Sequence, residues 1–349
     1  MSEFENLETK PEELQPNEQE GQLGNSEIID VTKSYFVDEI KLIENVVQQA
    51  SKKLIGQKEL IDLMMICILS DGHILLEGVP GIAKTLTAKT VAKTIGANFS
   101  RIQFTPDLMP ADIIGTSIFN MSNSTFSFKK GPIFSNVILI DEINRAPAKT
   151  QSALFEVMEE RQISFDGTTY QMQEPFIVIA TQNPIEQEGT YRLPEAQLDR
   201  FMMKILIDYP SYEDEMEILH RYKNTSGKLD LSDVASVLNE DNIKKFKEKI
   251  KEVNIHDQII SYITSIVQET RNHGRIYLGA SPRASLSILK SAKVAAILAG
   301  RNFVVPDDVQ YVAPHILNHR IILTPEAEMS GVTPHQLVKE IIKKVEVPR

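Results

Sequence analysis

The segment EGVPGIAKT, from Glu77 to Thr85, has residue types that could bind phosphate groups. It lies between an apolar run and a stretch with helical spacing. Backbone N–H groups in such a turn point to one place, and the helix N-terminus adds partial positive charge. Gly78, Lys84 and Thr85 match the pattern G-x-x-x-x-G-K-[ST], in which the lysine bridges the outer phosphates and the threonine binds Mg²⁺. The segment predicts a nucleotide-binding loop, with a chance glycine-containing turn as the alternative.

Ala83 departs from this pattern, which has glycine before the lysine. We expect the residue at this position to be entering the helix with a negative φ angle, where alanine is as suitable as glycine. Pro80 lacks an N–H group, but the residues from Gly81 to Thr85 still offer donors to a phosphate. The variant loop is therefore expected to work.

An acidic pair, Asp141-Glu142, ends a buried apolar run about fifty residues later. In the Walker B arrangement the aspartate holds Mg²⁺ through water and the glutamate polarises the attacking water. Alone, such a pair could simply cap the following helix. Ligands of open α/β sheets bind at the carboxyl ends of the strands, however, so the acidic pair and the phosphate loop support each other.

Two further polar residues follow in the same series. Asn183 comes directly after the run IVIAT, where its amide could bond both the γ-phosphate and the attacking water; a turn-forming asparagine before Pro184 is the alternative. Arg200, in LPEAQLDRF, could stabilise phosphoryl charge on a neighbouring subunit, or it could be an ordinary surface arginine.

The elements that would position these residues are visible as five short apolar runs separated by helical stretches. The runs lack polar alternation, which is typical of strands buried on both faces of a parallel sheet. They are HILLEG (73–78), FSRIQF (99–104), NVILIDE (136–142), FIVIATQN (176–183) and MKILIDY (203–209). Helices between the runs would cover both faces, so we predict a doubly wound α/β domain with a parallel five-stranded sheet.

Two segments interrupt this alternation and are predicted to be β-hairpins. The first covers residues 115–134 with its turn at Asn123-Ser124, and the second covers 162–176 with its turn at Asp166-Gly167. Such insertions often contact partners, and a passive role is the alternative. Beyond residue 209 the spacing is helical, which predicts a C-terminal all-α domain.

Composition limits the class of protein. The 349-residue chain has a net charge of −11, and residues 1–30 hold nine carboxylates and one lysine, which predicts a disordered acidic tail. We assign residues 31–210 to the nucleotide-binding core and 211–349 to the helical domain. No apolar run is long enough to span a membrane and no secretory signal is recognisable, so we expect a cytoplasmic protein. The overall acidity argues against tight nucleic-acid binding.

The cysteine and two histidines receive structural interpretations. Cys67, the single cysteine, lies in the apolar segment IDLMMICIL and is expected to be a buried, unreactive thiol. His315 and His319 have the i, i+4 spacing of a metal pair, but no glutamate follows His315 as H-E-x-x-H requires. Core or surface histidines are therefore favoured over metal ligands.

Taken in order, the motifs resemble those of the AAA+ ATPases, and specifically of the MoxR family. The motifs are IGQ (55–57), GVPGIAKT (78–85), ILIDEINRAPAKTQSALFEVMEER (138–161), ATQNP (180–184), LPEAQLDRF (193–201) and GASPRA (279–284), and the resemblance covers residues 35–345. It implies an AAA+ P-loop NTPase fold with two hairpin insertions and a helical lid. It also implies a ring, expected to be a homo-hexamer, in which Arg200 acts on the neighbouring subunit's nucleotide; Arg145 and Arg192 are lesser candidates for that interface.

The resemblance also completes the predicted site. Ile55 to Gln57 would line the adenine, and Arg283 would reach from the lid to the γ-phosphate as a second sensor. The nucleotide contacts are then Ile55, Gly56, Gln57, Gly78, Val79, Pro80, Gly81, Ile82, Ala83, Lys84, Thr85, Leu86 and Arg283. The predicted catalytic residues are Lys84, Glu142, Asn183 and Arg200, and the predicted Mg²⁺ ligands are Thr85 and Asp141.

The expected activity is Mg²⁺-dependent ATP hydrolysis. The resemblance implies that hydrolysis drives chaperone-like maturation or activation of protein complexes, including metal cofactor insertion, with a partner that carries a von Willebrand factor A domain. A nucleic-acid motor is an alternative supported by Lys129 and Lys130 and opposed by Asp166 and Glu174. A nucleotide-gated scaffold that hydrolyses ATP slowly is the other alternative.

Overall fold

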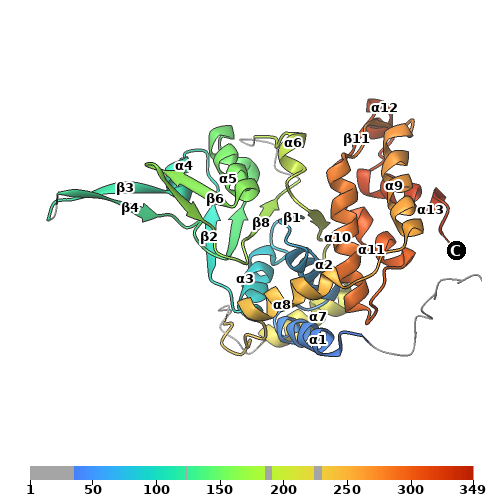
Figure 1. Cartoon of the computed structure of the whole chain (residues 1–349), viewed down its shortest axis with the longest axis horizontal. Helices are drawn as coiled ribbons and strands as arrows, with labels where there is room; N and C mark the ends of the chain where they lie inside the picture. Colours follow the sequence, from blue (N-terminus) through green and yellow to red (C-terminus); the bar gives the residue numbers. More distant parts are fainter. Residues whose placement is uncertain (1–34, 123, 185–190, 224–229, 349) are drawn as a thin grey trace, which may run out of the picture. The chain divides into compact units, whose positions relative to one another are not determined.

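The five predicted strands form one parallel sheet in the computed structural model, which describes residues 35–348 except 123, 185–190 and 224–229. The strand order is β2-β5-β8-β1-β9 (Figure 1). The strands are β1 (Ile74–Glu77), β2 (Phe99–Gln103), β5 (Val137–Asp141), β8 (Ile177–Gln182) and β9 (Met203–Leu206). Strand β8 lies between the strand of the phosphate loop and the strand of the acidic pair, so three of the predicted motifs end on adjacent strands.

The continuous apolar character of the strands has a direct structural reason. Successive strand residues point to opposite faces of a sheet. In β1, Ile74 and Leu76 belong to one buried cluster and Leu75 to another. In β5, Val137 and Leu139 alternate in the same way with the isoleucines that follow them. Both faces of the sheet are covered, so polar residues do not alternate with apolar ones along these strands.

Helices cover the two faces of the sheet, with α3 and α5 on opposite sides (Figure 1). The helices of this part are α1 (Val37–Ser51), α2 (Lys58–Leu69), α3 (Lys84–Thr94), α4 (Pro110–Ile114), α5 (Ala148–Glu160) and α6 (Glu195–Leu198), with a 3₁₀ turn η1 (Ile143–Arg145). Cys67 is buried on α2, and burial raises the pKa of its thiol.

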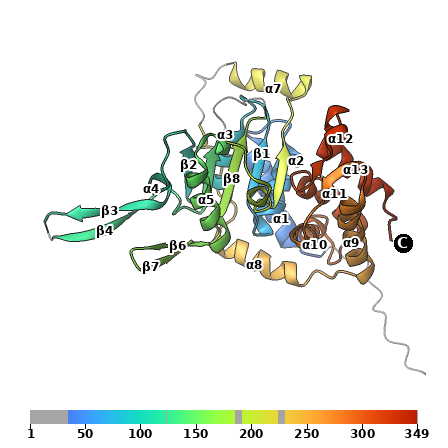
Figure 2. The ribbon, with the colours of Figure 1, turned by 90° about the horizontal axis from the view of Figure 1, so that it is seen from above.

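Both predicted hairpins are present, as β3 (Gly115–Asn120) with β4 (Thr125–Lys130) and β6 (Gln162–Phe165) with β7 (Thr168–Gln171). In the second turn Asp166 and Gly167 have φ angles of 52° and 76°, as a two-residue hairpin turn requires. In the first turn Ser124 has φ 53°, and residue 123 lies outside the described residues. Figure 2 shows the two hairpins extending beside each other.

The C-terminal part is helical, as predicted, with one short addition. Its helices are α7 (Tyr212–Tyr222), α8 (Glu240–Lys251), α9 (Asp257–Asn272), α10 (Pro282–Leu298), α11 (Pro306–Leu317), α12 (Pro325–Met329) and α13 (Pro334–Lys344). Strands β10 (Ile276–Leu278) and β11 (Ile322–Leu323) form a small antiparallel pair. Two or three residues are too few to show a strand pattern in the sequence.

A buried arginine attaches the lid helices to the sheet. The Arg320 side chain is 2% exposed and ion-pairs Asp199 at 2.6 Å. It also donates to the carbonyl groups of Phe201 at 2.7 Å and Met202 at 3.0 Å, immediately before β9. All described residues belong to one compact unit, so the domain boundary at residue 210 stays a prediction. The predicted disordered tail lies outside the described residues, and none of the described helices is long and apolar enough to cross a membrane.

Candidate active site

The phosphate loop joins β1 to α3 with two residues in the left-handed region. Gly81 has φ 88° and Ala83 has φ 62°, ψ 22°. The expected negative φ of Ala83 is therefore wrong: the alanine is the left-handed residue at the start of α3. This conformation costs a residue with a Cβ atom about 1 kcal/mol relative to the right-handed one. The loop stores backbone strain at the position where the common pattern has glycine.

Lys84 is folded back over this loop. Its ammonium donates to the carbonyl groups of Gly78 at 2.5 Å and Gln182 at 3.3 Å, at the ends of β1 and β8. The lysine charge therefore lies at the carboxyl edge of the sheet, where phosphates on the loop would be.

Asp141, at the end of β5, lies beside the loop. Its Oδ2 accepts a bond from the Thr85 hydroxyl at 3.3 Å, and its Oδ1 accepts one from Thr181 at 3.2 Å. Arg101 of β2, which the sequence did not single out, ion-pairs Oδ2 at 2.6 Å. A carboxylate beside a hydroxyl is an oxygen-donor set of the kind Mg²⁺ prefers, so Thr85 and Asp141 fit the predicted ion.

Glu142 is held in a strained, well-defined position. Its backbone has φ 58°, and its N–H donates to the Thr181 hydroxyl at 3.0 Å. The Gln103 amide donates to its Oε2 at 2.7 Å, and Arg145 lies 3.1 Å from the same oxygen. Thr181 thus fixes both members of the acidic pair; it lies in the motif ATQNP, but neither Thr181 nor Gln103 was assigned a role from the sequence.

Asn183 lies in the same row. It is 6% exposed and follows β8, the strand between the loop strand and β5. The structure therefore brings Lys84, Thr85, Asp141, Glu142 and Asn183 together at the carboxyl edge of three adjacent strands.

A cleft of about 580 Å³, here called the nucleotide cleft, adjoins this edge. Ile55, Gly56 and Gln57 line it, together with residues 205–211 at the end of β9 and directly after it. Gly56 has φ 69°, and a Cβ atom there would lie 2.3 Å from the Asp214 carboxylate. Gln57 accepts a bond from Thr87 of α3 at 3.1 Å, which links the cleft to the phosphate loop.

The lid closes the other side of the cleft with residues that the sequence did not assign to the site. They include Tyr311 and His315 of α11 and His335 and Lys339 of α13. The two imidazole rings are 5.9 Å apart, and each has a buried Nδ1 atom without a hydrogen-bond partner among the described residues. Burial lowers the pKa of His315 to about 4, so the ring is neutral near pH 7. His319, by contrast, is a core residue that donates to the Phe201 carbonyl at 3.0 Å.

Arg200 and Arg283 lie at the opposite edge of the sheet. Arg200 contacts the Phe155 carbonyl at 2.5 Å and Glu159 at 2.9 Å. Arg283 contacts the same Glu159 at 2.9 Å and lies 3.8 Å from Asp199. Glu159 lies in the last turn of α5 and Asp199 precedes β9, so this group is at the amino edge.

This position corrects one expectation. Arg283 was expected to reach the γ-phosphate, but the length of the sheet separates it from the loop of its own chain. Strand β9 alone spans roughly 13 Å at about 3.3 Å per residue. Of the lesser candidates, Arg145 contacts Glu142, and Arg192 is exposed. The remaining predicted contacts stay predictions; among them, Ile82 and Leu86 are buried against the core.

Known proteins are similar to this chain in sequence and in fold. Residues 73–203 match the ATPase family associated with various cellular activities (AAA), and residues 268–341 match the AAA lid domain. The chain is 43% identical to YeaC of Bacillus subtilis, over 90% of this chain and 98% of that one. It is 42% identical to Chaperone MoxR1 of Mycobacterium tuberculosis, over 89% of this chain and 84% of that one. A crystal structure from Cytophaga hutchinsonii matches with a TM-score of 0.83 and 44% identity, over 90% of this chain and 97% of that one.

Proposed function

This chain belongs to the MoxR family of AAA ATPases and is an ATP hydrolase, and from that premise we propose that it hydrolyses ATP at the carboxyl edge of its sheet to remodel other proteins. The supporting observation is that Lys84 meets the acidic pair Asp141-Glu142, from a distant segment of the chain, at that edge. The phosphates would lie on the loop and the base in the nucleotide cleft, beside the rings of His315 and His335.

In the proposed reaction a water oxygen attacks the γ-phosphorus, the bond to the β-phosphate oxygen breaks, and Glu142 accepts the proton of the water. Gln103 and Arg145 both bind Oε2 of Glu142, so Oε1 is the oxygen assigned to the proton. Lys84 would stabilise charge on the phosphates, and Asn183 would orient the water. Mg²⁺ held by Thr85 and Asp141 would neutralise phosphate charge, and Arg101 would then share or release Oδ2 of Asp141.

Arg200 and Arg283 are assigned to the nucleotide of a neighbouring subunit. Both lie at the amino edge, too far from their own loop, and Glu159 holds them together. A ring, expected to be a hexamer, would bring the amino edge of one subunit to the carboxyl edge of the next. Turnover measured against protein concentration distinguishes this ring from a slow nucleotide-gated scaffold, since turnover per subunit should rise with concentration only if assembly completes the sites.

The proposal of protein clients rests on the β3–β4 hairpin. Met121 and Phe126 at its end are 88% and 69% exposed, and Phe119 packs 5.1 Å from Phe126. An exposed apolar tip suits an unfolded or partly folded polypeptide. The name of the relative Chaperone MoxR1 is consistent with this. Metal insertion and a partner with a von Willebrand factor A domain stay predictions from the family.

A nucleic-acid motor has weaker support. Lys130 lies 5.0 Å and 5.7 Å from the ring centres of Phe134 and Tyr170, so this lysine is engaged in cation–π contacts at the base of the hairpin. Stimulation of ATP hydrolysis by DNA but not by a permanently unfolded protein would reverse our preference. Replacing Phe126 by serine should reduce stimulation by the unfolded protein and leave unstimulated hydrolysis unchanged.

The activity itself is tested with Glu142→Gln. Loss of the general base should lower the hydrolysis rate by roughly 10² to 10⁴-fold while ATP binding persists. The matched control is Glu160→Gln, an exposed residue at the end of α5. Unchanged turnover in Glu142→Gln would remove this residue from the role of base, and unchanged ATP binding in Lys84→Ala would remove the loop from the site.

A further inference from the structure

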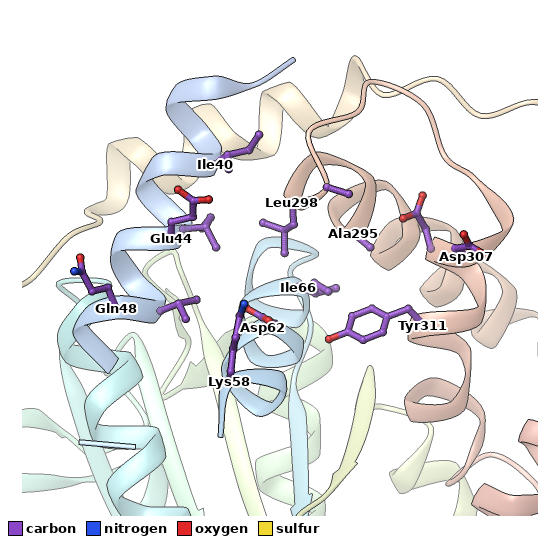
Figure 3. A pocket seen from close by; sticks show the side chains of 14 residues that line it. Ile40, Glu44, Gln48, Lys58, Asp62, Ile66, Ala295, Leu298, Asp307 and Tyr311 are labelled. Carbon is purple, nitrogen blue, oxygen red and sulfur yellow. The ribbon is translucent and has the colours of Figure 1, made fainter. Parts of the chain in front are cut away.

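A second cavity, of about 610 Å³, lies between α1 and α2 of the core and α10 and α11 of the lid (Figure 3). We call it the acid-rimmed groove. Its aliphatic walls come from α1, α2 and α10, and α11 adds Tyr311 and two aspartates; the aliphatic residues are Ile40, Ile43, Val47, Ile66, Ala295 and Leu298. The groove is separate from the nucleotide cleft, and the proposed function assigns it no role.

The rim of the groove is negatively charged. Glu44 of α1 and Asp307 of α11 are exposed on opposite sides, and Asp62 of α2 lies between them (Figure 3). Lys58 is the one cation among the groove's lining residues. Asp308 also lines the groove, but Arg301 binds both of its carboxylate oxygens, at 2.6 and 2.8 Å. Glu44, Asp62 and Asp307 against Lys58 leave an excess of negative charge around an aliphatic floor.

We propose that the acid-rimmed groove binds a cationic amphipathic α-helix of a partner protein. An aliphatic trough between helices accepts residues at i, i+3, i+4 and i+7 of an incoming helix. The carboxylates on both sides would then meet lysine or arginine residues flanking that apolar stripe. Nucleic acid and anionic lipid surfaces are disfavoured by the same charges.

The groove and the nucleotide cleft share two walls. Along α2, Lys58 and Asp62 face the groove while Glu59 and Leu63 face the cleft. Along α11, Tyr311 lines both cavities. Since both cavities lie between core and lid, a change in lid position alters both. A helix in the groove should therefore change the affinity for ATP, and ATP should change the affinity for the helix by the same factor.

Binding is tested with a fluorescent helical peptide of leucine and lysine, compared with a peptide in which glutamate replaces every lysine. Fluorescence anisotropy on the full chain should show binding of the lysine peptide, weakened by salt, and none of the glutamate peptide. Reversing the two exposed rim charges with Glu44→Lys and Asp307→Lys should weaken binding about tenfold or more, since two favourable charge pairs become unfavourable.

The control carries the same charge change elsewhere, with Glu326→Lys and Glu328→Lys on α12, and should bind as the unmodified chain does. Equal binding of both peptides, or equal weakening by the control, would overturn the proposal. An ATP affinity unmoved by saturating peptide would overturn the coupling. Lys84→Ala separates this proposal from the proposed function, because it should lose ATP and keep the peptide.

Discussion

In the proposed mechanism, the two edges of the sheet hold different halves of an ATPase site. At the carboxyl edge, Lys84, Asp141 and Glu142 lie together, as the proposed binding and hydrolysis of a nucleotide require. At the amino edge, Arg200 and Arg283 are held together by carboxylates and face no phosphate loop of their own chain. The strands between them have a fixed length. Under the proposed function, a complete site would need the carboxyl edge of one copy and the amino edge of another.

The largest expected effect tests this division directly. Arg200→Ala should keep ATP binding and lower hydrolysis by roughly 10³-fold or more, the range known for arginine fingers. Mixing it with Glu142→Gln should restore part of the activity, because an intact Arg200 from one variant can then face an intact Glu142 in the other. The measurement is ATP turnover of each variant alone and of equimolar mixtures. A mixture no more active than its components would mean that the two edges do not meet between subunits.

The sequence predicted the carboxyl edge better than the amino edge, for a physical reason. Asp141 ends a strand, Asn183 follows one, and Lys84 comes after the loop that follows another; parallel strands end at one edge, so local pattern was enough to group these residues. The position of Arg283 depends on how the lid docks, which is decided by distant contacts such as Arg320 with Asp199. No local pattern encodes such contacts, and the same applies to the lid residues in the nucleotide cleft.

The backbone conformation of Ala83 could not be predicted from the sequence either. Alanine favours the right-handed helical region, and only the tertiary environment of the loop makes Ala83 left-handed. Gly56 shows the opposite case, since its φ of 69° and the nearby Asp214 give a reason for glycine.

The amino edge contains a structural arginine beside the two that we propose to act on a nucleotide, which allows a sharper comparison. Arg320 is 2% exposed and Arg283 is 47% exposed, yet both contact Asp199. Arg320→Leu should lower the free energy of unfolding by about 3–5 kcal/mol, because Asp199 and the carbonyls before β9 lose a buried partner. Arg283→Leu should lower it by less than about 1 kcal/mol. Urea denaturation measures both, and equal losses would refute the distinction between a lid clamp and a surface pair.

Two buried histidines, His73 and His315, should make the stability of the chain depend on pH. Burial lowers the pKa of His73, at the start of β1, and of His315, in the nucleotide cleft, to about 4 in each case. The unfolded chain binds these protons below about pH 6.5 and the folded chain only near pH 4, so stability is full above 6.5 and falls as the pH drops between these values. Each histidine should lower the free energy of unfolding by on the order of 2 kcal/mol at pH 4 relative to neutral pH.

The measurement is the free energy of unfolding between pH 7.5 and 4.5. His315→Gln should reduce the acid-dependent loss of unfolding free energy by the contribution of one histidine, because glutamine does not take up a proton in this range. The substitution removes no hydrogen bond at Nδ1 among the described residues. ATP should protect the unmodified chain from acid more than it protects His315→Gln. Equal protection would place the bound nucleotide away from this ring.

The smallest expected effect concerns the strain at the carboxyl edge. Ala83→Gly removes a left-handed conformation that costs about 1 kcal/mol but adds flexibility to the unfolded chain, so the free energy of unfolding should rise by no more than about 1 kcal/mol. The control is Ala148→Gly in the first turn of α5, an exposed helical alanine, which should lose about 0.5–1 kcal/mol. Opposite signs in thermal unfolding would locate strain in the loop. Equal losses of unfolding free energy in the two variants would mean that Ala83 is not left-handed in solution. The carboxyl edge would then contain no backbone strain at this alanine.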